Sequence, residues 1–392
     1  MKILHYHRNI RLEKGGVVRF VLDVCAAMAA RGHEVTLASP DITDVPAAWT
    51  KTAGGLPRVV RLDTPLGGLG VWGPEAMRRA RAALASVDVA HLHGAWMPTN
   101  VQLGRAAEGL GVPYVMSPHG MLDDWCTSQS AAKKRLFHAL AGKRLFAHAA
   151  AVHCTAQAEL DQSQKWFPGA RSAVIPLLID MDQFRTLPGP EEARSAFPRP
   201  LAAAPTVLFL SRLHPKKGVE VLIDAVAALK SRGVDCNLLI AGSGDSRYAA
   251  ALGRRVGERD ITDRTRFLGM VTGRLKVSLF QSADVLALPT SQENFGLALA
   301  EAMACGVPAV TTRGVDIWPE LEASGGAVLC EATPAAFAGA LERLLGDPGA
   351  RARLSDAARA WAAGYLDPRS VVLQYERLYD DIRRRTGEAA KA

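Results

Sequence analysis

Two acidic side chains, Glu293 and Glu301, stand eight positions apart in the stretch SQENFGLALAEAMACGVPAV (residues 291–310). The residues between them are mostly apolar and include one glycine, which is the composition of a buried strand end that continues into a buried helix. On a straight helix, two residues at this spacing lie roughly 12 Å apart along the axis. Carboxylates so far apart cannot share one proton as a close catalytic pair does, but they can bind hydroxyl groups at opposite ends of an elongated ligand.

A basic loop, SRLHPKKG (residues 211–218), comes directly after an apolar run and before a predicted helix, and it contains Arg212 and Lys217. A helix N-terminus offers free backbone amides and the positive end of a dipole, so two cations beside it make a suitable diphosphate site. We predict phosphate binding here, with a solvated basic turn as the alternative. The loop EKGG is the weaker counterpart in the first half, where Gly15 and Gly16 allow close approach of the backbone.

The two features together match one kind of ligand. A nucleoside diphosphate sugar carries sugar hydroxyls at one end, a diphosphate in the middle and ribose hydroxyls at the other end. The glutamates would bind the two ends, and the basic loop would bind the middle.

The elements that must position these groups repeat once along the chain. Residues 2–37 and 206–240 each read as an apolar strand, a basic loop ending in Lys and Gly, an amphipathic helix, Arg-Gly, and another strand. The two Arg-Gly pairs lie 201 positions apart in a chain of 392 residues. Two such units, each opening one half, predict two doubly wound α/β domains. Further parallel strands are predicted at 88–94, 113–120, 236–244, 265–271 and 284–290.

The length also exceeds what one ordinary core accommodates, which favours two domains. A proline-rich stretch at 177–205 predicts a linker. We therefore expect an N-terminal domain over 1–180 and a C-terminal domain over 181–366. The tail, 367–392, reads as a helix with an apolar stripe and is expected to pack back on the first domain.

The composition, 48% hydrophobic and 22% charged, is that of a globular protein. No apolar run reaches 18 residues, so no transmembrane helix is predicted. The N-terminus lacks the features of a signal peptide and reads as a first strand. Six scattered cysteines without a CxxC pair argue against a zinc ribbon and fit reduced thiols. We expect a cytoplasmic location.

The net charge of +8 is unevenly spread. Residues 125–158 contain five Lys and Arg but no Asp or Glu, with apolar residues between the cations at helical spacing. The basic segment 131–148 is therefore a candidate for contact with an anionic membrane at its inner face. An ordinary surface helix is the alternative. Nucleic acid is not an expected partner, because no aromatic–basic stripe or known binding motif accompanies the charge.

The motifs E-x7-E and SRLHPKKG resemble the pattern of the retaining enzymes of glycosyltransferase family 4, also called glycosyl transferase group 1. HLHG, SPHG, RFLGMV and AEAMACGVPAVTT resemble further pieces of that pattern, in the same order. The resemblance covers nearly the whole chain. It implies an α/β protein of the GT-B fold: two facing Rossmann-like domains with a deep interdomain cleft, the second binding the donor and the first the acceptor.

The resemblance also implies roles for single residues of the E-x7-E segment. Glu293 would bind hydroxyls of the donor sugar and face the reacting carbon. Asn294, Phe295 and Gly296 would offer backbone amides to the sugar and the phosphate. Glu301 would hold the ribose.

Outside that segment, the resemblance implies that Arg212 and Lys217 bind the diphosphate and stabilise the leaving group. Met270 would meet the base through its backbone. The glycine loop at 13–16 would approach the phosphates. His119, in SPHG, would lie near the donor sugar, with a structural histidine as the alternative.

The implied reaction moves a hexose from a nucleoside-diphosphate sugar to a glycan or a lipid-linked glycan, with retention of configuration and without a metal or cofactor. The stretch SPHGMLDDWCTSQSAAKKRLF resembles enzymes of bacterial surface-polysaccharide assembly, which implies exopolysaccharide or lipopolysaccharide synthesis and a polyprenyl-diphosphate-linked acceptor. Two alternatives stay open. One is a nucleotide-sugar epimerase on the same fold, and the other is a non-catalytic nucleotide-sugar-binding protein.

Three further motifs formally match known sites but do not predict one here. His91 and His93 have the i,i+2 spacing of a metal pair, but no third ligand follows them in the sequence, so no metal site is predicted. The GSG at 242–244 is an incomplete dinucleotide fingerprint. Asp180 and Asp182 spell the D-x-D of metal-dependent glycosyltransferases but fall in the predicted linker.

Overall fold

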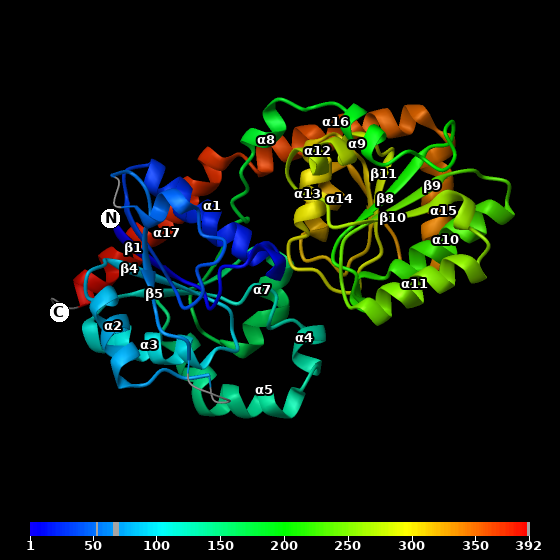
Figure 1. Cartoon of the computed structure of the whole chain (residues 1–392). Coiled ribbons are helices and arrows are strands. Elements are labelled where there is room, and N and C mark those ends of the chain that lie inside the picture. The colour runs from blue at the N-terminus through cyan, green and yellow to red at the C-terminus, as the bar shows by residue number, and fades with distance from the viewer. Residues whose placement is uncertain (52–53, 66–69, 390–392) are drawn as a thin grey trace. The chain divides into compact units, whose positions relative to one another are not determined.

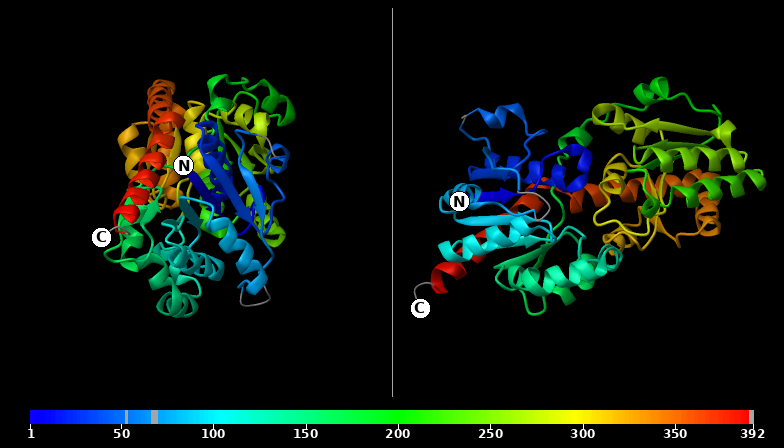
Figure 2. Two further views of the ribbon diagram at one scale, coloured as in Figure 1. Left: turned by 90° about the vertical axis from the view of Figure 1, so that its left-hand side faces the viewer. Right: turned by 60° about the horizontal axis from the view of Figure 1, so that its bottom comes forward.

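The structure is a computed structural model that describes residues 1–51, 54–65 and 70–389. Its internal contacts divide the chain into two compact units (Figure 1). Unit 1 comprises Met1–Asp180 and Pro368–Ala392, and unit 2 comprises Met181–Asp367. The first strand and the last helix of the chain therefore belong to the same unit, as the blue and red ends of the ribbon show (Figure 2).

Within the described residues, unit 1 contains a parallel sheet of seven strands in the order β3-β2-β1-β4-β5-β6-β7. The chain runs outward from β1 to β3, then returns and runs outward from β4 to β7. This reversal is the doubly wound arrangement. The strands are β1 (Lys2–Tyr6), β2 (Glu34–Ser39), β3 (Arg58–Arg61), β4 (Val89–His93), β5 (Tyr114–Ser117), β6 (Ala151–Cys154) and β7 (Ser172–Val174).

Helices cover both faces of this sheet. One face packs an apolar cluster against α2, α3 and α6, and the other face lies against α1 and α17. Alternate residues of a strand point to opposite faces, so the two layers draw on different residues of the same strands. The helices are α1 (Gly16–Ala30), α2 (Pro74–Leu84), α3 (Pro98–Leu110), α4 (Asp124–Ser128), α5 (Ala131–Phe137), α6 (Lys143–Ala147), α7 (Gln157–Ser163) and α17 (Pro368–Ala389).

Unit 2 repeats this plan with a parallel sheet that has, among the residues described, six strands in the order β10-β9-β8-β11-β12-β13. Its chain also runs outward, returns to the middle and runs outward on the other side. The strands are β8 (Thr206–Leu210), β9 (Asn237–Ala241), β10 (Thr265–Gly269), β11 (Val285–Leu288), β12 (Ala309–Thr311) and β13 (Ala327–Leu329).

In unit 2, α10, α11 and α15 lie together on one side of the sheet, and α12 and α13 lie on the other (Figure 1). α16 packs against α13, and α9 packs against α12. The helices are α8 (Asp182–Arg185), α9 (Glu191–Ala196), α10 (Val219–Ser231), α11 (Ser246–Glu258), α12 (Gly273–Gln281), α13 (Leu297–Ala304), α14 (Trp318–Ser324), α15 (Pro334–Gly346) and α16 (Pro348–Tyr365).

The predicted internal repeat is confirmed: β1–α1–β2 and β8–α10–β9 are the two copies. In each copy the glycine of the Arg-Gly pair takes a left-handed conformation just past the helix, with φ of 86° at Gly32 and 75° at Gly233. The five further predicted strands correspond to β4, β5, β9, β10 and β11. Both units are doubly wound α/β sheets, so the prediction of two doubly wound α/β domains is also confirmed.

Over the described part of the chain, no helix is long and apolar enough to cross a membrane.

Candidate functional site

The order of strands in unit 2 locates the most favourable place for a ligand. β8 and β11 are neighbours in the sheet, although their connections lead away in opposite directions. In open α/β sheets, ligands bind beside the carboxyl ends of the strands at such a reversal, because the diverging loops leave a crevice there. The loop after β8 (211–218) carries the predicted basic cluster, and the loop after β11 (289–296) carries the first glutamate.

Glycines allow these loops to pack backbone against backbone. Gly218 has φ of 66°, and a Cβ added to it would lie 2.1 Å from the carbonyl oxygen of Pro289. Gly242, at the start of the GSG motif, has φ of 142° and would place a Cβ 1.8 Å from the carbonyl oxygen of Ser211. Neither contact tolerates a side chain. The GSG motif therefore has a packing role in the structure, beside the loop that carries the cations.

Lys217 and Glu293 form an ion pair across these two loops. The lysine side chain is only 3% exposed, and the glutamate side chain is 26% exposed. The Lys217 ammonium also lies 3.4 Å from the carbonyl oxygen of Gln292. Burial lowers the pKa of Lys217, while the charge of Glu293 and its hydrogen bond oppose that shift. A buried cation is thus kept at the sheet edge by one carboxylate, which still has an exposed part.

Two further cations surround this pair. Lys216 donates to Oε1 of Gln292 over 2.7 Å. Arg212 is exposed and makes no ion pair within the described residues. Its guanidinium is near enough to contribute to the lowered pKa of Lys217. The loop therefore presents an uncompensated positive charge next to the Lys217–Glu293 pair.

The segment after Glu293 leads into the start of α13. Asn294 donates to Oδ2 of Asp316 over 3.2 Å, which ties this loop to the one after β12. The side chain of Phe295 is 2% exposed and belongs to the core. Gly296 is the N-cap of α13, with φ of 71°. The backbone amides of Phe295 and Gly296 donate no hydrogen bond within the described part of the chain. A helix start with free amides is suited to bind an anion.

Glu301 lies inside α13, away from the helix start. Its Oε1 accepts a hydrogen bond from the Lys276 ammonium over 2.7 Å, and its side chain is 12% exposed. Sequence reasoning missed Lys276, because α12 shows no motif around it. The prediction that Glu301 binds ribose is not tested by this contact, since a paired carboxylate can still accept bonds from hydroxyls.

Met270 follows β10 and its side chain is 60% exposed. The contact predicted between Met270 and the nucleobase would be made by the backbone of Met270, not by this side chain. Of the predicted residues in unit 2, the structure brings Arg212, Lys217, Glu293 and Gly296 to one edge of the sheet.

In unit 1, the predicted glycine loop lies at the start of α1. Gly15 is the N-cap, with φ of 108° and ψ of −162°, a conformation that is essentially restricted to glycine. A Cβ added to Gly15 would meet no atom within 4 Å. Gly16 is the first residue of the helix. Backbone conformation, and not crowding, therefore requires a glycine at position 15, and the open space fits a loop that approaches a ligand.

His119 lies in the turn after β5 and is 6% exposed. Its φ of 53° places it in the left-handed region, which is unusual for a residue with a side chain and is often found at functional sites. Nε2 lies 2.9 Å from Nδ1 of His93. Nδ1 is buried and has no hydrogen-bond partner in the described residues. Burial holds the pKa of His119 well below its ordinary value.

The same face of the sheet corrects one part of the sequence analysis. His91 and His93 do have a third histidine beside them, because β1 is adjacent to β4 and brings His5 into contact. The three rings offer nitrogen atoms within 4.8 Å of one another. Five of their six ring nitrogens are engaged in hydrogen bonds with protein groups, and His5 Nε2 is the exception. These bonds favour a hydrogen-bonded cluster over a set of metal ligands.

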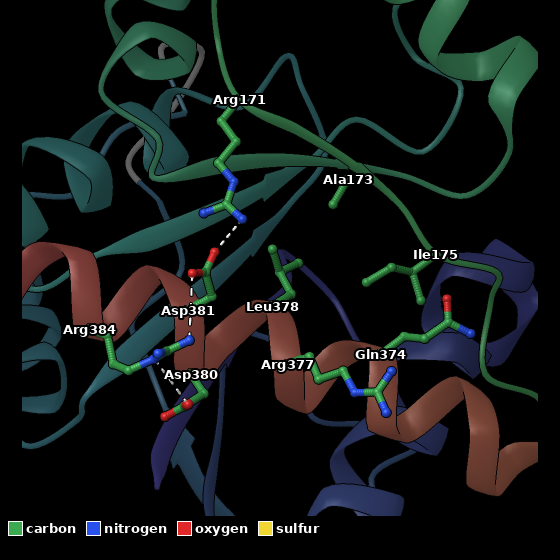
Figure 3. A pocket seen from close by; sticks show the side chains of 9 residues that line it. All are labelled: Arg171, Ala173, Ile175, Gln374, Arg377, Leu378, Asp380, Asp381 and Arg384. Carbon is green, nitrogen blue, oxygen red and sulfur yellow. Dashed lines mark ion pairs between the residues drawn. The ribbon is translucent and has the colours of Figure 1, made fainter.

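Unit 1 also has a surface pocket of about 460 Å³ between β7 and α17 (Figure 3). Arg171 points toward Asp381 and forms an ion pair with it, and Arg384 pairs with Asp380 over 3.4 Å. The opposite charges that line this pocket largely compensate one another. The lining contains no residue that the sequence singled out: Arg171, Ala173, Ile175, Gln374, Arg377, Leu378, Asp380, Asp381 and Arg384.

Comparison with known proteins identifies the family. Residues 195–361 match the family described as glycosyl transferases group 1, and residues 15–177 match the glycosyl transferase 4-like domain. The D-inositol 3-phosphate glycosyltransferase of Salinispora tropica is 30% identical, over 92% of this chain and 80% of that protein. The GDP-mannose-dependent alpha-(1-6)-phosphatidylinositol dimannoside mannosyltransferase of Mycobacterium tuberculosis is 33% identical, over 85% of both chains.

Solved structures agree on the architecture. The crystal structure of Anabaena HepE in complex with UDP and glucose superposes with a TM-score of 0.77, covering 97% of this chain and 100% of that one at 20% identity. That identity supports the fold alone, which is the GT-B arrangement of two Rossmann-like domains. Together with the family matches, these findings show that the chain belongs to the group 1 glycosyltransferases, enzymes that transfer sugars.

Proposed function

We propose that the protein is a retaining, metal-independent glycosyltransferase that moves a hexose from a nucleoside-diphosphate sugar to a glycan or lipid-linked glycan. The observation that carries the proposal is the edge of unit 2 at β8 and β11. There, the buried Lys217 paired with the partly exposed Glu293, an exposed Arg212 and the backbone amides before α13, which donate no hydrogen bond in the described part of the chain, gather in one place. Positive charge beside a partly exposed carboxylate suits a ligand that carries a diphosphate next to hydroxyl groups.

These groups can stabilise the departing diphosphate without a metal ion. When the bond between the anomeric carbon and the phosphate oxygen breaks, negative charge develops on that oxygen. Arg212, Lys217 and the helix amides would neutralise it. The new bond forms between the same carbon and the acceptor oxygen on the same face of the sugar, and the acceptor proton passes to the departing phosphate. Glu293 would hold the sugar hydroxyls so that the anomeric carbon is exposed.

Two relatives support a nucleotide-sugar donor and leave its base open. The mycobacterial mannosyltransferase is named for GDP-mannose, and the Anabaena structure contains UDP and glucose. We therefore infer that the donor is a nucleoside-diphosphate hexose, whose base is guanine or uracil.

The donor site is tested with Glu293→Gln, which keeps the size of the side chain and an oxygen that can accept from Lys217. Binding of UDP-glucose, GDP-mannose and ADP-glucose is measured by calorimetry, and donor turnover is measured with and without a glycan acceptor. We expect one donor to bind the wild type, and the variant to lose at least 100-fold in turnover, in the range found when one group that stabilises a transition state is removed. Unchanged turnover would refute the assignment of Glu293.

The same measurements separate the reaction classes. A transferase consumes its donor only slowly without an acceptor, since water is then the only acceptor. An epimerase would interconvert the nucleotide sugar fully in the absence of any acceptor. Binding without turnover under both conditions would favour a non-catalytic binding protein.

For the acceptor, we propose a lipid-linked glycan at the inner membrane surface, as in bacterial surface-polysaccharide synthesis. Leu136 on α5 is 60% exposed, and Leu140, one turn later in the π-helical turn His138–Gly142, is 73% exposed. Lys133, Arg135 and Lys143 around them are exposed as well. Leucines of this exposure among cations suit the interface of an anionic bilayer. The mycobacterial relative is named for a phosphatidylinositol-based acceptor.

Flotation tests this contact with vesicles that contain or lack phosphatidylglycerol. We expect the wild type to float with anionic vesicles only, and the double change Leu136→Gln and Leu140→Gln to abolish flotation. Leu110→Gln, at another exposed leucine (40%) of unit 1, is the matched control and should leave flotation unchanged. A wild type that stays unbound to anionic vesicles contradicts the membrane contact but leaves the donor assignment intact.

A further inference from the structure

The rings of His5, His93 and His119 are joined in sequence by two hydrogen bonds. Nδ1 of His5 is 3.2 Å from Nε2 of His93, and Nδ1 of His93 is 2.9 Å from Nε2 of His119. The ring centroids are 5.5 Å and 5.2 Å apart, so in both pairs they lie 2.3 Å further apart than the bonded nitrogens. That excess is about twice the distance from the centre of an imidazole to its nitrogen atoms. Each hydrogen bond therefore runs along the line that joins the two ring centres.

A linear contact of this length distinguishes hydrogen bonding from metal binding. A metal between two histidine nitrogens, each about 2.0–2.1 Å away, would either separate them by about 4 Å on a straight line or bend the arrangement. Neither applies to these pairs. The three rings form a chain of two N–H···N hydrogen bonds, which we call the His5–His93–His119 chain.

Such a chain has only two states when its rings are neutral. Burial keeps the rings neutral, because it lowers the pKa of His5 to about 3 and holds the pKa values of His93 and His119 well below the ordinary value. A neutral imidazole has one N–H and one lone pair. Each bond needs one of each, so all three rings carry their proton on Nε2, or all three carry it on Nδ1.

The two ends of the chain leave this choice open. His5 Nε2 and His119 Nδ1 are buried without hydrogen-bond partners in the described part of the chain. In one state His119 Nδ1 is an acceptor, and in the other it is a donor. An unpartnered buried nitrogen is costly and calls for an explanation.

By contrast, a second hydrogen-bonded chain on the same sheet face has only one possible direction. His153 Nε2 lies 2.9 Å from the carbonyl oxygen of Ile175, which can only accept, so His153 carries its proton there. Ser117 then donates to His153 Nδ1 over 2.7 Å and accepts from His91 Nε2 over 2.6 Å. The hydroxyl of Tyr379 donates to His91 Nδ1 over 2.7 Å. This second chain ends on a carbonyl and has a single direction, whereas the His5–His93–His119 chain does not.

We propose that His93 is a positioning residue for His119: through the His5–His93–His119 chain it fixes the His119 ring, leaves Nδ1 as the nitrogen that meets a sugar hydroxyl, and lets that nitrogen donate or accept as the three rings change tautomer together. The inference rests on the proposed function and on the role that the resemblance to the family implies for His119, which is contact with the donor sugar. Phe20 of α1 packs over the rings of both His93 and His119, with centroids 5.8 and 5.6 Å away. The positions of the rings are thus held by α1, the helix that begins at Gly16.

Nitrogen NMR on the full chain labelled with 15N-histidine tests the coupled tautomers directly. Long-range proton–nitrogen correlation at neutral pH distinguishes Nδ1–H, Nε2–H and charged rings, with assignments from single histidine substitutions. We expect His5, His93 and His119 to show one shared tautomer and His91 and His153 to show Nε2–H. Different tautomers within the His5–His93–His119 chain, or a charged ring in it, would overturn the proposal.

Binding measurements test the positioning role. His93→Phe keeps a buried ring but removes both nitrogens. We expect this variant to bind the nucleotide sugar of the wild type (UDP-glucose or GDP-mannose) about fivefold more weakly, as for loss of one hydrogen bond. Its affinity for the bare diphosphate, UDP or GDP, should be unchanged. His91→Phe is the matched control, because it replaces an equally buried ring of the second chain, and it should change neither affinity.

The outcomes separate this inference from the proposed function. If His93→Phe weakens binding of the nucleotide sugar and of the bare diphosphate equally, His93 has a structural role and the positioning role is contradicted. Unchanged affinity for both ligands also contradicts the positioning role. If the wild type binds none of these compounds, the proposed donor fails, and the tautomer measurement still decides whether the three rings are coupled.

Discussion

The two units share one strand order but fill one face of their sheets differently. Position for position in the internal repeat, His5 on β1 corresponds to Phe209 on β8, and His91 on β4 corresponds to Ala287 on β11. Of the ten histidines in the chain, nine belong to unit 1, and the tenth is His214. The same backbone plan therefore surrounds a buried polar network in unit 1 and apolar side chains in unit 2.

The difference shows two ways of placing polar groups in a doubly wound domain. Unit 1 buries neutral imidazoles and phenol groups, most of which form hydrogen bonds with one another within the layer under α1 and α17. Unit 2 keeps its sheet apolar and places charges in loops at the carboxyl edge, where Lys217 and Glu293 meet. The stability of the buried neutral groups in unit 1 therefore depends on their hydrogen bonds and on pH. The position of the charges at the edge of unit 2 depends on close packing of the loops that carry them.

Acidification gives the largest expected effect and should act on unit 1. The pKa values are lowered for His5 to about 3 and for His153 to about 4, and are held well below the ordinary 6.5 for His91, His93 and His119. The unfolded chain then binds more protons than the folded chain below about pH 6.5. As the pH falls below this value, each such histidine lowers the free energy of unfolding by about 1.4 kcal/mol per pH unit, until the pKa of the folded state is reached.

We therefore expect unit 1 to unfold between about pH 5 and 4 while unit 2 stays folded. Hydrogen exchange resolved by peptide and corrected for the intrinsic rate at each pH measures this. Parallel loss of protection in both units, or earlier loss in unit 2, would contradict the comparison.

Exchanging the corresponding side chains tests whether the two sheet faces differ in what they tolerate. Phe209 is fully buried and pairs in register with Ile240. Phe209→His would place an imidazole among apolar groups and should destabilise unit 2 by about 3–5 kcal/mol. His5→Phe leaves His93 Nε2 unpartnered and should cost unit 1 about 1–3 kcal/mol at pH 7, while reducing the acid sensitivity by one histidine. Chemical denaturation at pH 7 and pH 5.5 measures both losses of stability, and equal losses would contradict the difference between the two sheet faces.

Loop packing in unit 2 is tested with glycines. Gly218→Ala forces a Cβ to within 2.1 Å of the Pro289 carbonyl at a left-handed position, and we expect a loss of about 3 kcal/mol. Gly233→Ala is the matched control, since Gly233 is also left-handed but has no atom within 4 Å of the added Cβ. It should cost only about 1 kcal/mol. Denaturant titrations of both variants measure the difference, and similar losses would show that crowding at Pro289 is unimportant.

The smallest effect concerns one hydroxyl. Tyr379→Phe removes the donor to His91 Nδ1 in a fully buried place and should cost about 1–2 kcal/mol. Tyr248→Phe in unit 2 removes a hydroxyl that donates to Glu220 over 2.8 Å, from a side chain that is only partly buried. We expect less than about 0.5 kcal/mol there, because water can replace the lost contact. A thermal-melt comparison checks the order of the two costs.

The fold was largely predictable from the sequence, and the site only in part. Short apolar runs, Arg-Gly after each helix and the repeat of elements predicted both doubly wound sheets. The same reasoning located Lys217 and Glu293 at strand ends, because parallel strands end at one edge. It did not predict that they pair with each other, since 76 residues separate them in the chain. It likewise missed the partner of Glu301, because Lys276 lies on α12 without any motif around it.

The reasoning about His91 and His93 shows the limit most clearly. A search along the sequence found no third ligand, whereas β1 lies beside β4 and brings His5 into the cluster. Spacing alone predicted either a metal pair or nothing, and the linear contacts of the rings indicate a hydrogen-bonded chain instead.

By itself, then, the sequence determined which residue types stand at the ends of strands and helices, because hydropathy, glycine and proline set the order and limits of those elements. Tertiary structure alone decided the partners of the polar groups: the Lys217 ammonium for Glu293, the Lys276 ammonium for Glu301 and the hydrogen-bonded chain of three imidazoles. The physical reason is that a parallel sheet places strands side by side that are distant in the chain. The environment of a buried polar group, and hence its charge and its hydrogen bonds, depends on those neighbours.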